Sequence, residues 1–238
     1  MGRGTGYRYS EERVMNKVTT GMQKLDKLLG GGFPDKTVIL LSGGPGTGKT
    51  LFGINFLLEG AKKGERVCYV SLSETKEEIV RACKGIEKLK DIEKFLGKNL
   101  AIEYIGLSDS DVNLKMFVSL MREYPKIDRI VIDNANKLLM FAENTRSYRI
   151  NFSQILESLK NTGCSLVICE TDEDGLDSGN GEAYECDGVV NLSFVDLEER
   201  PMRTLAVHKM RYSYFDAKVP HQFLIESSGL RLGETKVI

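Results

Sequence analysis

Short apolar runs alternate with amphipathic stretches along most of the chain. Continuous apolar runs of about four to eight residues are typical of buried strands, and such runs lie at residues 37–42, 66–72, 100–105, 128–133 and 164–170. Apolar positions with helical spacing lie at residues 49–63, 75–80, 111–124 and 147–160. Strands that are apolar throughout and alternate with helices predict an α/β fold, with a mostly parallel twisted sheet and helices on both faces.

The pattern changes near the C-terminus. From Gly188 onward, the runs VVNLSFV, MRTLAVHKM and HQFLIES follow one another with short polar turns and predict an antiparallel extension of the sheet. The segment 171–187 before them holds seven acids, no Lys or Arg and several glycines, and we expect an exposed loop there. Residues 1–16 are mildly basic and predict a flexible tail, so that one domain would span residues 17–238.

Composition narrows the class of protein. The 238 residues, with 41% hydrophobic and 28% charged side chains, are ordinary for a soluble globular protein. A formal net charge of -1 provides no overall attraction to nucleic acid or to an anionic membrane. The apolar runs are too short to span a bilayer. The five cysteines, of which Cys68, Cys164 and Cys169 lie in strand-like runs, predict buried free thiols in a cytoplasmic protein.

A phosphate-binding motif follows the first apolar run. The segment GGPGTGKT fits G-x-x-x-x-G-K-[ST] and lies between a predicted strand and a predicted helix, a context that disfavours an accidental match. Its glycines would let backbone N–H groups wrap the phosphates of ATP, beside the positive end of the helix. Lys49 would reach the β- and γ-phosphates and Thr50 would bind Mg²⁺. The predicted binding residues are Gly43, Gly44, Pro45, Gly46, Thr47, Gly48, Lys49 and Thr50.

Three carboxylates follow predicted strands, at the edge where parallel sheets bind ligands. Asp133 ends the run IVID and is predicted to be a second Mg²⁺ contact, although an Asp at a strand end can also simply begin a turn. Glu74 follows the strand 66–72 and could orient or deprotonate the attacking water, or could be an acid that the helix dipole favours. Glu170 could take the same catalytic role or could begin the acidic segment.

Two cations stand two positions apart in VHKMRYS. Residues at this spacing share one face of a strand, so Lys209 and Arg211 are expected to lie side by side. One interpretation is a solvated edge strand protected by its charges. The other is that both cations face an anion, since the predicted site has no other evident cation for the outer side of the γ-phosphate. Arg suits this role because it donates two parallel hydrogen bonds to phosphate.

These motifs and their surroundings resemble the KaiC-like branch of the RecA superfamily. The resemblance lies in KVTTGMQKLDKLLGGGFPDKTVILLSGGPGTGKT, EGAKKGERVCYVSLSET and RTLAVHKMRYSYFDAKVPHQFLIESSGL, and it runs from about Lys17 to about Leu230. It implies a RecA-like P-loop core, with Asp133 as the Walker B residue and Mg-ATP bound between subunits, often in a hexameric ring. In this family the residues that match Lys209 and Arg211 reach the neighbour's ATP. KaiC has two such domains in tandem, whereas this chain resembles the stand-alone proteins common in archaea and some bacteria.

Two departures from the family pattern leave the function open. Members often carry two adjacent glutamates where this chain has Ser73 and Glu74, and the usual R-G-[ST]-x-H is replaced by RYSYF from Arg211. The protein could be an ATPase that acts through conformational or assembly change, or an ATP-binding scaffold or switch with little hydrolysis that docks to a larger machine. Recombinase-like DNA binding is disfavoured, because segment 171–187 would repel phosphates. The sequence does not indicate a protein partner.

Overall fold

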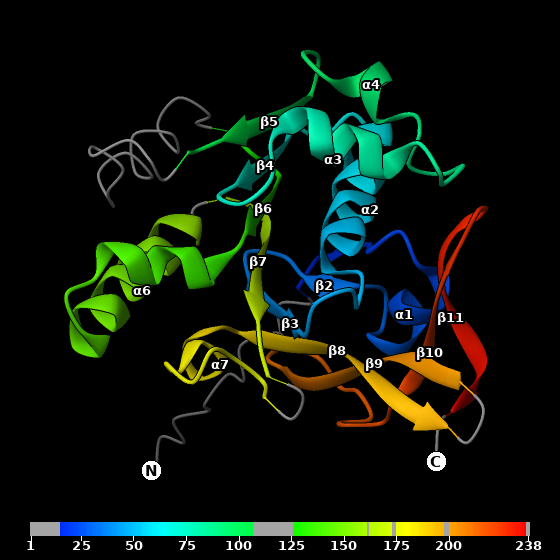
Figure 1. Ribbon diagram of the computed structural model, residues 1–238. Coiled ribbons are helices and arrows are strands. Elements are labelled where there is room, and N and C mark those ends of the chain that lie inside the picture. Colours follow the sequence, from blue (N-terminus) through cyan, green and yellow to red (C-terminus); the bar gives the residue numbers. More distant parts are fainter. Residues whose placement is uncertain (1–14, 107–125, 161, 173–174, 198–199, 237–238) are drawn as a thin grey trace, which may run out of the picture.

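The computed structural model describes residues 15–106, 126–160, 162–172, 175–197 and 200–236 (Figure 1). The strands are β1 (Lys17–Val18), β2 (Phe33–Pro34), β3 (Val38–Gly43), β4 (Val67–Ser71), β5 (Leu100–Tyr104), β6 (Arg129–Asp133), β7 (Cys164–Glu170), β8 (Gly188–Leu197), β9 (Arg200–Met210), β10 (His221–Glu226) and β11 (Gly229–Lys236). The helices are α1 (Gln23–Leu28), α2 (Lys49–Lys62), α3 (Lys76–Cys83), α4 (Ile92–Phe95), α6 (Thr145–Leu159), α7 (Glu182–Glu185) and the 3-10 helix η1 (Ala135–Phe141).

Within the described residues, nine strands form one sheet in the order β11-β10-β9-β8-β3-β7-β6-β4-β5. The strands from β8 to β5 in this order pair in parallel, whereas β8 to β11 pair antiparallel with one another. The predicted parallel sheet with a C-terminal antiparallel extension is therefore confirmed. The extension also contains β11, which the sequence pattern did not predict.

Helices cover both faces of the parallel strands, as Figure 1 shows for α2 and α3 on one side and α6 on the other. The side chains of β3 alternate between the two faces. Ile39 and Leu41 join the hydrophobic cluster that includes Phe52 of α2, whereas Val38 and Leu40 join the cluster that includes the buried side of α6. This double burial explains why the strand is apolar at every position.

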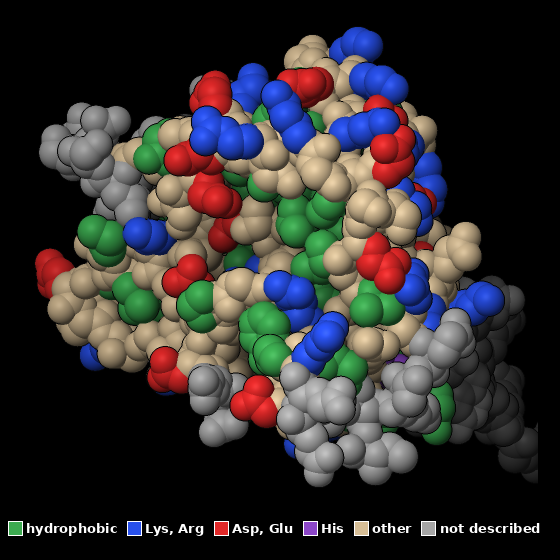
Figure 2. All heavy atoms as spheres, turned by 45° about the vertical axis from the view of Figure 1, so that its right-hand side comes forward, with side chains coloured by type: hydrophobic (Ala, Val, Ile, Leu, Met, Phe, Trp, Pro, Cys, Tyr) green, Lys and Arg blue, Asp and Glu red, His purple; other side chains and the backbone are tan. Residues whose placement is uncertain are grey.

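Hydrophobic and charged side chains gather in different areas on one face of the molecule. On the face seen in Figure 2, hydrophobic side chains gather in the middle, and charged ones crowd the top, over α3 and α4.

Helix α3 begins with the predicted capping box. The Thr75 hydroxyl accepts a hydrogen bond from the backbone of Glu78, whose carboxylate accepts from the backbone of Thr75.

The acidic segment 171–187 is only partly the exposed loop that its composition predicts. Part of it forms α7, in which Glu182 is buried at 1% exposure and accepts a hydrogen bond from the Tyr148 hydroxyl at 2.6 Å. Asp187 is buried as well and accepts from the backbone N–H of Val38 at 3.1 Å. The prediction was wrong for these acids because a carboxylate can be buried where donors meet it.

The structure confirms the prediction for the cysteines, whereas two other predictions fall on residues that it does not describe. All five cysteines are free and buried, as predicted from Cys68, Cys164 and Cys169. The helix predicted at residues 111–124 lies outside the described residues, and so does the predicted tail apart from its last two residues. Among the residues that the structure describes, no helix combines the length and the apolar character needed to cross a membrane.

A buried arginine ties strand β6 to the N-terminal segment. Arg129, at the start of β6, is 1% exposed and binds the Glu65 carboxylate through its Nε and one terminal nitrogen, at 2.5 Å and 3.0 Å. Its other terminal nitrogen donates to the carbonyl oxygens of Thr19 and Phe56, at 2.6 Å and 2.9 Å. The planar guanidinium thus joins three segments that are distant in sequence.

We expect Arg129→Ala to lower the free energy of unfolding by about 3–5 kcal/mol, because it leaves a carboxylate and two carbonyls without their donor. Urea denaturation followed by circular dichroism measures this loss. Arg231→Ala is the matched control, since Arg231 forms a similar two-point pair with Glu226 at the surface, where ion pairs contribute little. Equal losses in the two variants would contradict the prediction.

Candidate functional site

The carboxyl ends of four parallel strands meet at one edge of the sheet. The register pairs Gly43 at the end of β3 with Glu170 at the end of β7, and Ser71 at the end of β4 with Asp133 at the end of β6. Open α/β sheets bind their ligands outside this edge. The fold therefore brings the predicted phosphate loop, both strand-terminal acids and the segment that carries Glu74 to one place.

Two glycines of the loop are required by close packing. Gly43 has φ +153°, and a Cβ atom there would lie 2.2 Å from the carbonyl oxygen of Leu192 on β8. Gly48 has a left-handed φ of +103° directly before α2, and a Cβ atom there would lie 2.5 Å from Ile225 Cδ1 on β10. At Gly43 a side chain would meet backbone, and at Gly48 the left-handed φ would strain any other residue, so both positions favour glycine.

Hydrogen bonds already hold the key side chains of the motif in place. Lys49 Nζ donates to the carbonyl oxygen of Gly44 at 2.8 Å across the loop, and burial lowers the pKa of this lysine. Thr50 Oγ1 donates to Asp133 Oδ2 at 2.9 Å, and the Tyr69 hydroxyl donates to the same oxygen at 2.5 Å. Burial raises the pKa of Asp133, and these two hydrogen bonds oppose that shift. The hydroxyl and the carboxylate are oxygen donors of the kind that Mg²⁺ takes, so the pair fits this cation.

Glu74 lies beside Asp133 on the same edge and is partly buried. Its backbone N–H donates to Ser71 Oγ at 2.9 Å, which fixes the turn after β4. Burial raises the pKa of Glu74, and the negative charges of Asp133 and Glu78 raise it further. A carboxylate in this setting is more basic than one in water, which suits a group that accepts a proton from water.

Two further polar side chains line the same cavity. Ser73 is exposed and occupies the position before Glu74. Glu170 is also exposed, and Asn136 binds its backbone on both sides, accepting from its N–H at 2.7 Å and donating to its carbonyl at 2.9 Å. Glu170 is thus the third carboxylate that lines this cavity, with Glu74 and Asp133.

A cavity of about 610 Å³ opens at this edge, a volume that suits a small-molecule ligand. It is lined by Pro45, Gly46, Gly48, Lys49, Thr50, Leu51, Ser73, Glu74, Asp133, Asn134, Glu170, Arg203 and Ile225. Most of the residues that the sequence predicted for binding and for water activation thus surround one space, together with several that it did not predict.

Arg203 is the lining residue that sequence reasoning missed. Its Nε donates to the carbonyl oxygen of Gly46 at 3.1 Å, and its guanidinium lies 5.1 Å from the centroid of the Phe194 ring. The cavity therefore holds a cation of its own chain besides Lys49, which the sequence analysis did not identify. No local motif marks this arginine, because only the pairing of β9 with β8 brings it to the loop.

The two predicted cations, Lys209 near the end of β9 and Arg211 just after it, do not line this cavity in their own chain. Lys209 instead contacts carbonyl oxygens of α7 and the residue after it, and Arg211 NH1 donates to Asp187 Oδ1 at 3.1 Å. Burial lowers the pKa of Lys209, as does the neighbouring charge of Arg211. Tyr212 follows with φ +61°, a left-handed conformation that favours the glycine of the family pattern.

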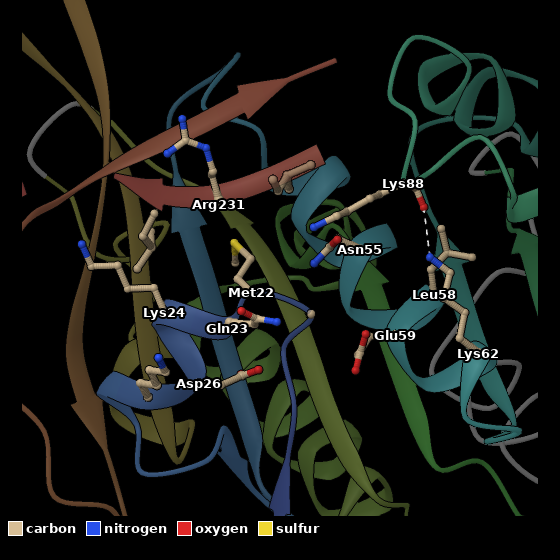
Figure 3. Close-up of a pocket in the computed structure, with 14 residues that line it drawn as sticks. Met22, Gln23, Lys24, Asp26, Asn55, Leu58, Glu59, Lys62, Lys88 and Arg231 are labelled. Carbon is tan, nitrogen blue, oxygen red and sulfur yellow. Dashed lines mark hydrogen bonds between the residues drawn. The ribbon is translucent and has the colours of Figure 1, made fainter. Parts of the chain in front are cut away.

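A second cavity of about 760 Å³ lies between α1, the C-terminal half of α2 and β11 (Figure 3). Its walls carry lysines that already bind backbone carbonyls, Lys24 that of Gly233 and Lys62 that of Lys88 at 3.3 Å. In Figure 3, the side chain of Asn55 points toward this space from α2. No lining residue comes from the strand ends that carry the acids, so this cavity is separate from the candidate site.

Comparison with known proteins assigns the family. The chain matches the family described as "ATPase: KaiC" over residues 18–237. Among curated proteins, a UPF0273 protein of Pyrococcus horikoshii is 28% identical and covers 94% of this chain and 97% of its own. The circadian clock protein KaiC2 of Synechocystis is 32% identical over 93% of this chain, which spans 40% of that longer protein.

The fold leads to the same group of proteins. The crystal structure of a KaiC-like protein from Pyrococcus horikoshii superposes with a TM-score of 0.78 and 25% identity, covering 92% of this chain and 99% of the other. The predicted resemblance and the predicted RecA-like fold are both confirmed. The chain belongs to the KaiC ATPase family.

Proposed function

We propose that this protein binds Mg-ATP in the cavity at the sheet edge and hydrolyses it, and that the nucleotide state changes its conformation or its assembly. One observation carries the proposal, namely the convergence of Lys49, Thr50 and Asp133 beside a loop in which Gly43 packs against the backbone of β8. Family membership supports ATP as the nucleotide. The buried free thiols agree with a reducing, cytoplasmic environment.

Each residue of the cavity has a distinct task in this proposal. The loop backbone and Lys49 hold the phosphates, and Lys49 exchanges its bond to Gly44 for phosphate oxygens. Thr50 and Asp133 hold Mg²⁺, which when bound neutralises charge on the phosphates. Arg203 adds a second cation to the lining of the cavity, where it is already held against the loop at Gly46.

Glu74 is the proposed general base. It is the partly buried carboxylate beside Asp133, and its raised pKa favours proton acceptance from an attacking water. Ser73 stands where the family often has a second glutamate, so the base acts without a paired acid. A low turnover follows from this arrangement, and binding without turnover is the alternative for a scaffold or switch.

The pair formed by Lys209 and Arg211 is proposed to serve the cavity of a neighbouring copy. Both lie outside the cavity of their own chain, and the Arg211 side chain is half exposed, at 50%. A cation supplied in trans accelerates phosphoryl transfer by roughly 10³–10⁵ in well-studied systems. The proposal therefore requires a homo-oligomer, and a hexameric ring is the assembly that we expect.

We expect Lys49→Ala to weaken ATP binding by about 10- to 100-fold, because it removes a charge-assisted contact with the phosphates. Equilibrium titration with a fluorescent ATP analogue measures the affinity, and circular dichroism checks the fold. Lys62→Ala, at the far end of the same helix, is the control and should bind like wild type. Unchanged affinity in Lys49→Ala would remove the phosphate site from the proposal.

Glu74→Gln should preserve ATP affinity and lower turnover by about 10²–10⁴, the usual contribution of a general base. The change keeps the size of the side chain and removes the basic oxygen. Since only the ionised carboxylate accepts a proton, wild-type turnover should also fall as the pH drops through the raised pKa of Glu74. Phosphate release measured against pH tests both points. Wild-type turnover in the variant would assign the base to Glu170 instead.

Mixing two inactive variants tests the action across subunits. Lys49→Ala keeps the cation pair, and the double variant Lys209→Ala with Arg211→Ala keeps the phosphate loop, so neither should hydrolyse ATP alone. Mixed subunits should regain turnover, because some interfaces then combine an intact loop with an intact pair. In preparations shown to co-assemble by native mass spectrometry, absence of recovery would exclude the action in trans.

A further inference from the structure

The cavity between α1, α2 and β11 has an excess of positive charge in its lining. Five of its lining residues are basic and two are acidic, which leaves an excess of three positive charges around about 760 Å³. The charged residues are Lys24, Lys27, Lys62, Lys88, Arg231, Asp26 and Glu59. A cleft lined mainly by one sign of charge raises the local concentration of ligands of the opposite sign, so this cavity attracts anions.

Neighbours outside the cavity compensate one of its acids and one of its cations. Glu59 forms an ion pair with Lys63 at 2.8 Å, and Arg231 binds Glu226 through two nitrogens, at 2.8 Å and 2.9 Å. Neither of these two partners lines the cavity. After both pairings, four lysines face a single acid of the lining, Asp26, so the excess of positive charge remains.

Two of the four lysines fix the walls of the cavity. Lys24 donates to the carbonyl oxygen of Gly233, and Lys62 donates to that of Lys88 at 3.3 Å. These bonds connect α1 to β11, and α2 to the segment between α3 and α4. Because a carbonyl group has no net charge, both ammonium groups keep their full positive charge while they hold the walls together.

Lys88 is placed at the cavity by close packing. A Cβ atom at Gly229 would lie 2.6 Å from Lys88 Cδ, so the lysine chain lies directly against the glycine backbone at the start of β11. The preceding residue, Glu87, donates its N–H to the carbonyl oxygen of Ser227 at 2.7 Å and fixes the same segment. In Figure 3 the side chain of Lys88 runs toward Asn55 of α2.

The ammonium groups of Lys27 and Lys88 are available to a ligand. Within the part of the chain that the structure describes, neither group has a hydrogen-bond or ion-pair partner. The buried part of the lining is mostly apolar, with Met22, Leu58 and Leu230 at 1–2% exposure. The cavity thus combines free cations at its rim with an apolar interior.

We propose that this cavity is a second anion site, which binds a phosphorylated small molecule through Lys27 and Lys88. A phosphate monoester carries a charge of about −1.5 to −2 at pH 7, which suits several ammonium groups better than the single charge of a carboxylate. Lysine is a common phosphate binder, and the volume is within the range of small-molecule sites. Because this cavity is separate from the phosphate loop, the inference does not depend on the proposed function.

Acetylation of lysines, read by mass spectrometry, tests the site in the full chain. The probes are inorganic pyrophosphate and adenosine monophosphate, at about 0.15 M ionic strength, where a screening length of about 8 Å suppresses distant charges. At a probe concentration several times the dissociation constant, Lys27 and Lys88 should be acetylated at least about fivefold more slowly, because the free fraction reacts. Lys84 and Lys98 are exposed, line neither cavity and should react as without probe.

The same labelling in Lys49→Ala separates this site from the phosphate loop, and the protection of Lys27 and Lys88 should persist there. Its loss in this variant would overturn the inference, as would equal protection by sodium chloride at the same ionic strength. Stronger protection by adenosine monophosphate would identify an organic phosphate that uses the apolar interior. Stronger protection by pyrophosphate would identify an inorganic one.

Calorimetric titration of Lys49→Ala with the stronger probe measures the contribution of the two cations. Adding Lys27→Ala and Lys88→Ala should lower the affinity at least about tenfold, because two charge-assisted contacts are lost. Adding Lys84→Ala and Lys98→Ala instead removes the same charge elsewhere on the surface and should leave the affinity unchanged. Equal losses in the two variants would show that net charge, and not this cavity, attracts the probe, and would overturn the inference.

Discussion

The buried carboxylate of Asp133 is the constraint on which the arrangement of this site depends. It ends β6 inside an apolar sheet, and an ionised group in that position must be met by donors. Thr50 from α2 and Tyr69 from β4 supply them to the same oxygen. These two bonds fix the start of the helix after the phosphate loop to two neighbouring strands. Burial nevertheless raises the pKa of Asp133, so a bound divalent cation would offset the unfavourable desolvation of its charge.

The same edge shows how one chain builds a ligand site from distant segments. Gly43 and Gly48 come close to β8 and β10, respectively, which lie in the antiparallel extension. Arg203 returns from β9 to bind the loop at Gly46. The extension is therefore part of the site as well as of the sheet. Its strands cover the phosphate loop on the side away from the acids of β6 and β7.

Much of this arrangement could be predicted from the sequence, because local signals determine it. The apolar run of β3, the glycine-rich motif and the run that ends at Asp133 each depend on neighbouring residues, and all three are confirmed as elements. Arg203 could not be found in this way, because its place is set by pairing between strands. The catalytic roles of Glu74, Lys209 and Arg211 stay predictions.

Acid-rich composition was misleading for a related reason. Seven acids in segment 171–187 predicted exposure, and yet Glu182 and Asp187 are buried because Tyr148, Val38 and Arg211 donate to them. The argument that segment 171–187 would repel DNA phosphates therefore becomes weaker, because two of its acids are buried. Likewise β11 was missed because only Leu230 and Leu232 are apolar in it, too few positions for an alternating strand pattern.

Asp187 links two parts of the molecule, the strand that leads to the phosphate loop and the side chain of Arg211. Through Val38 it is bound to the first residue of the strand that leads to the chain's own phosphate loop, and through Arg211 it is bound to a group directed outward. A change at either end of this link would therefore be felt at the other, because one buried carboxylate holds both.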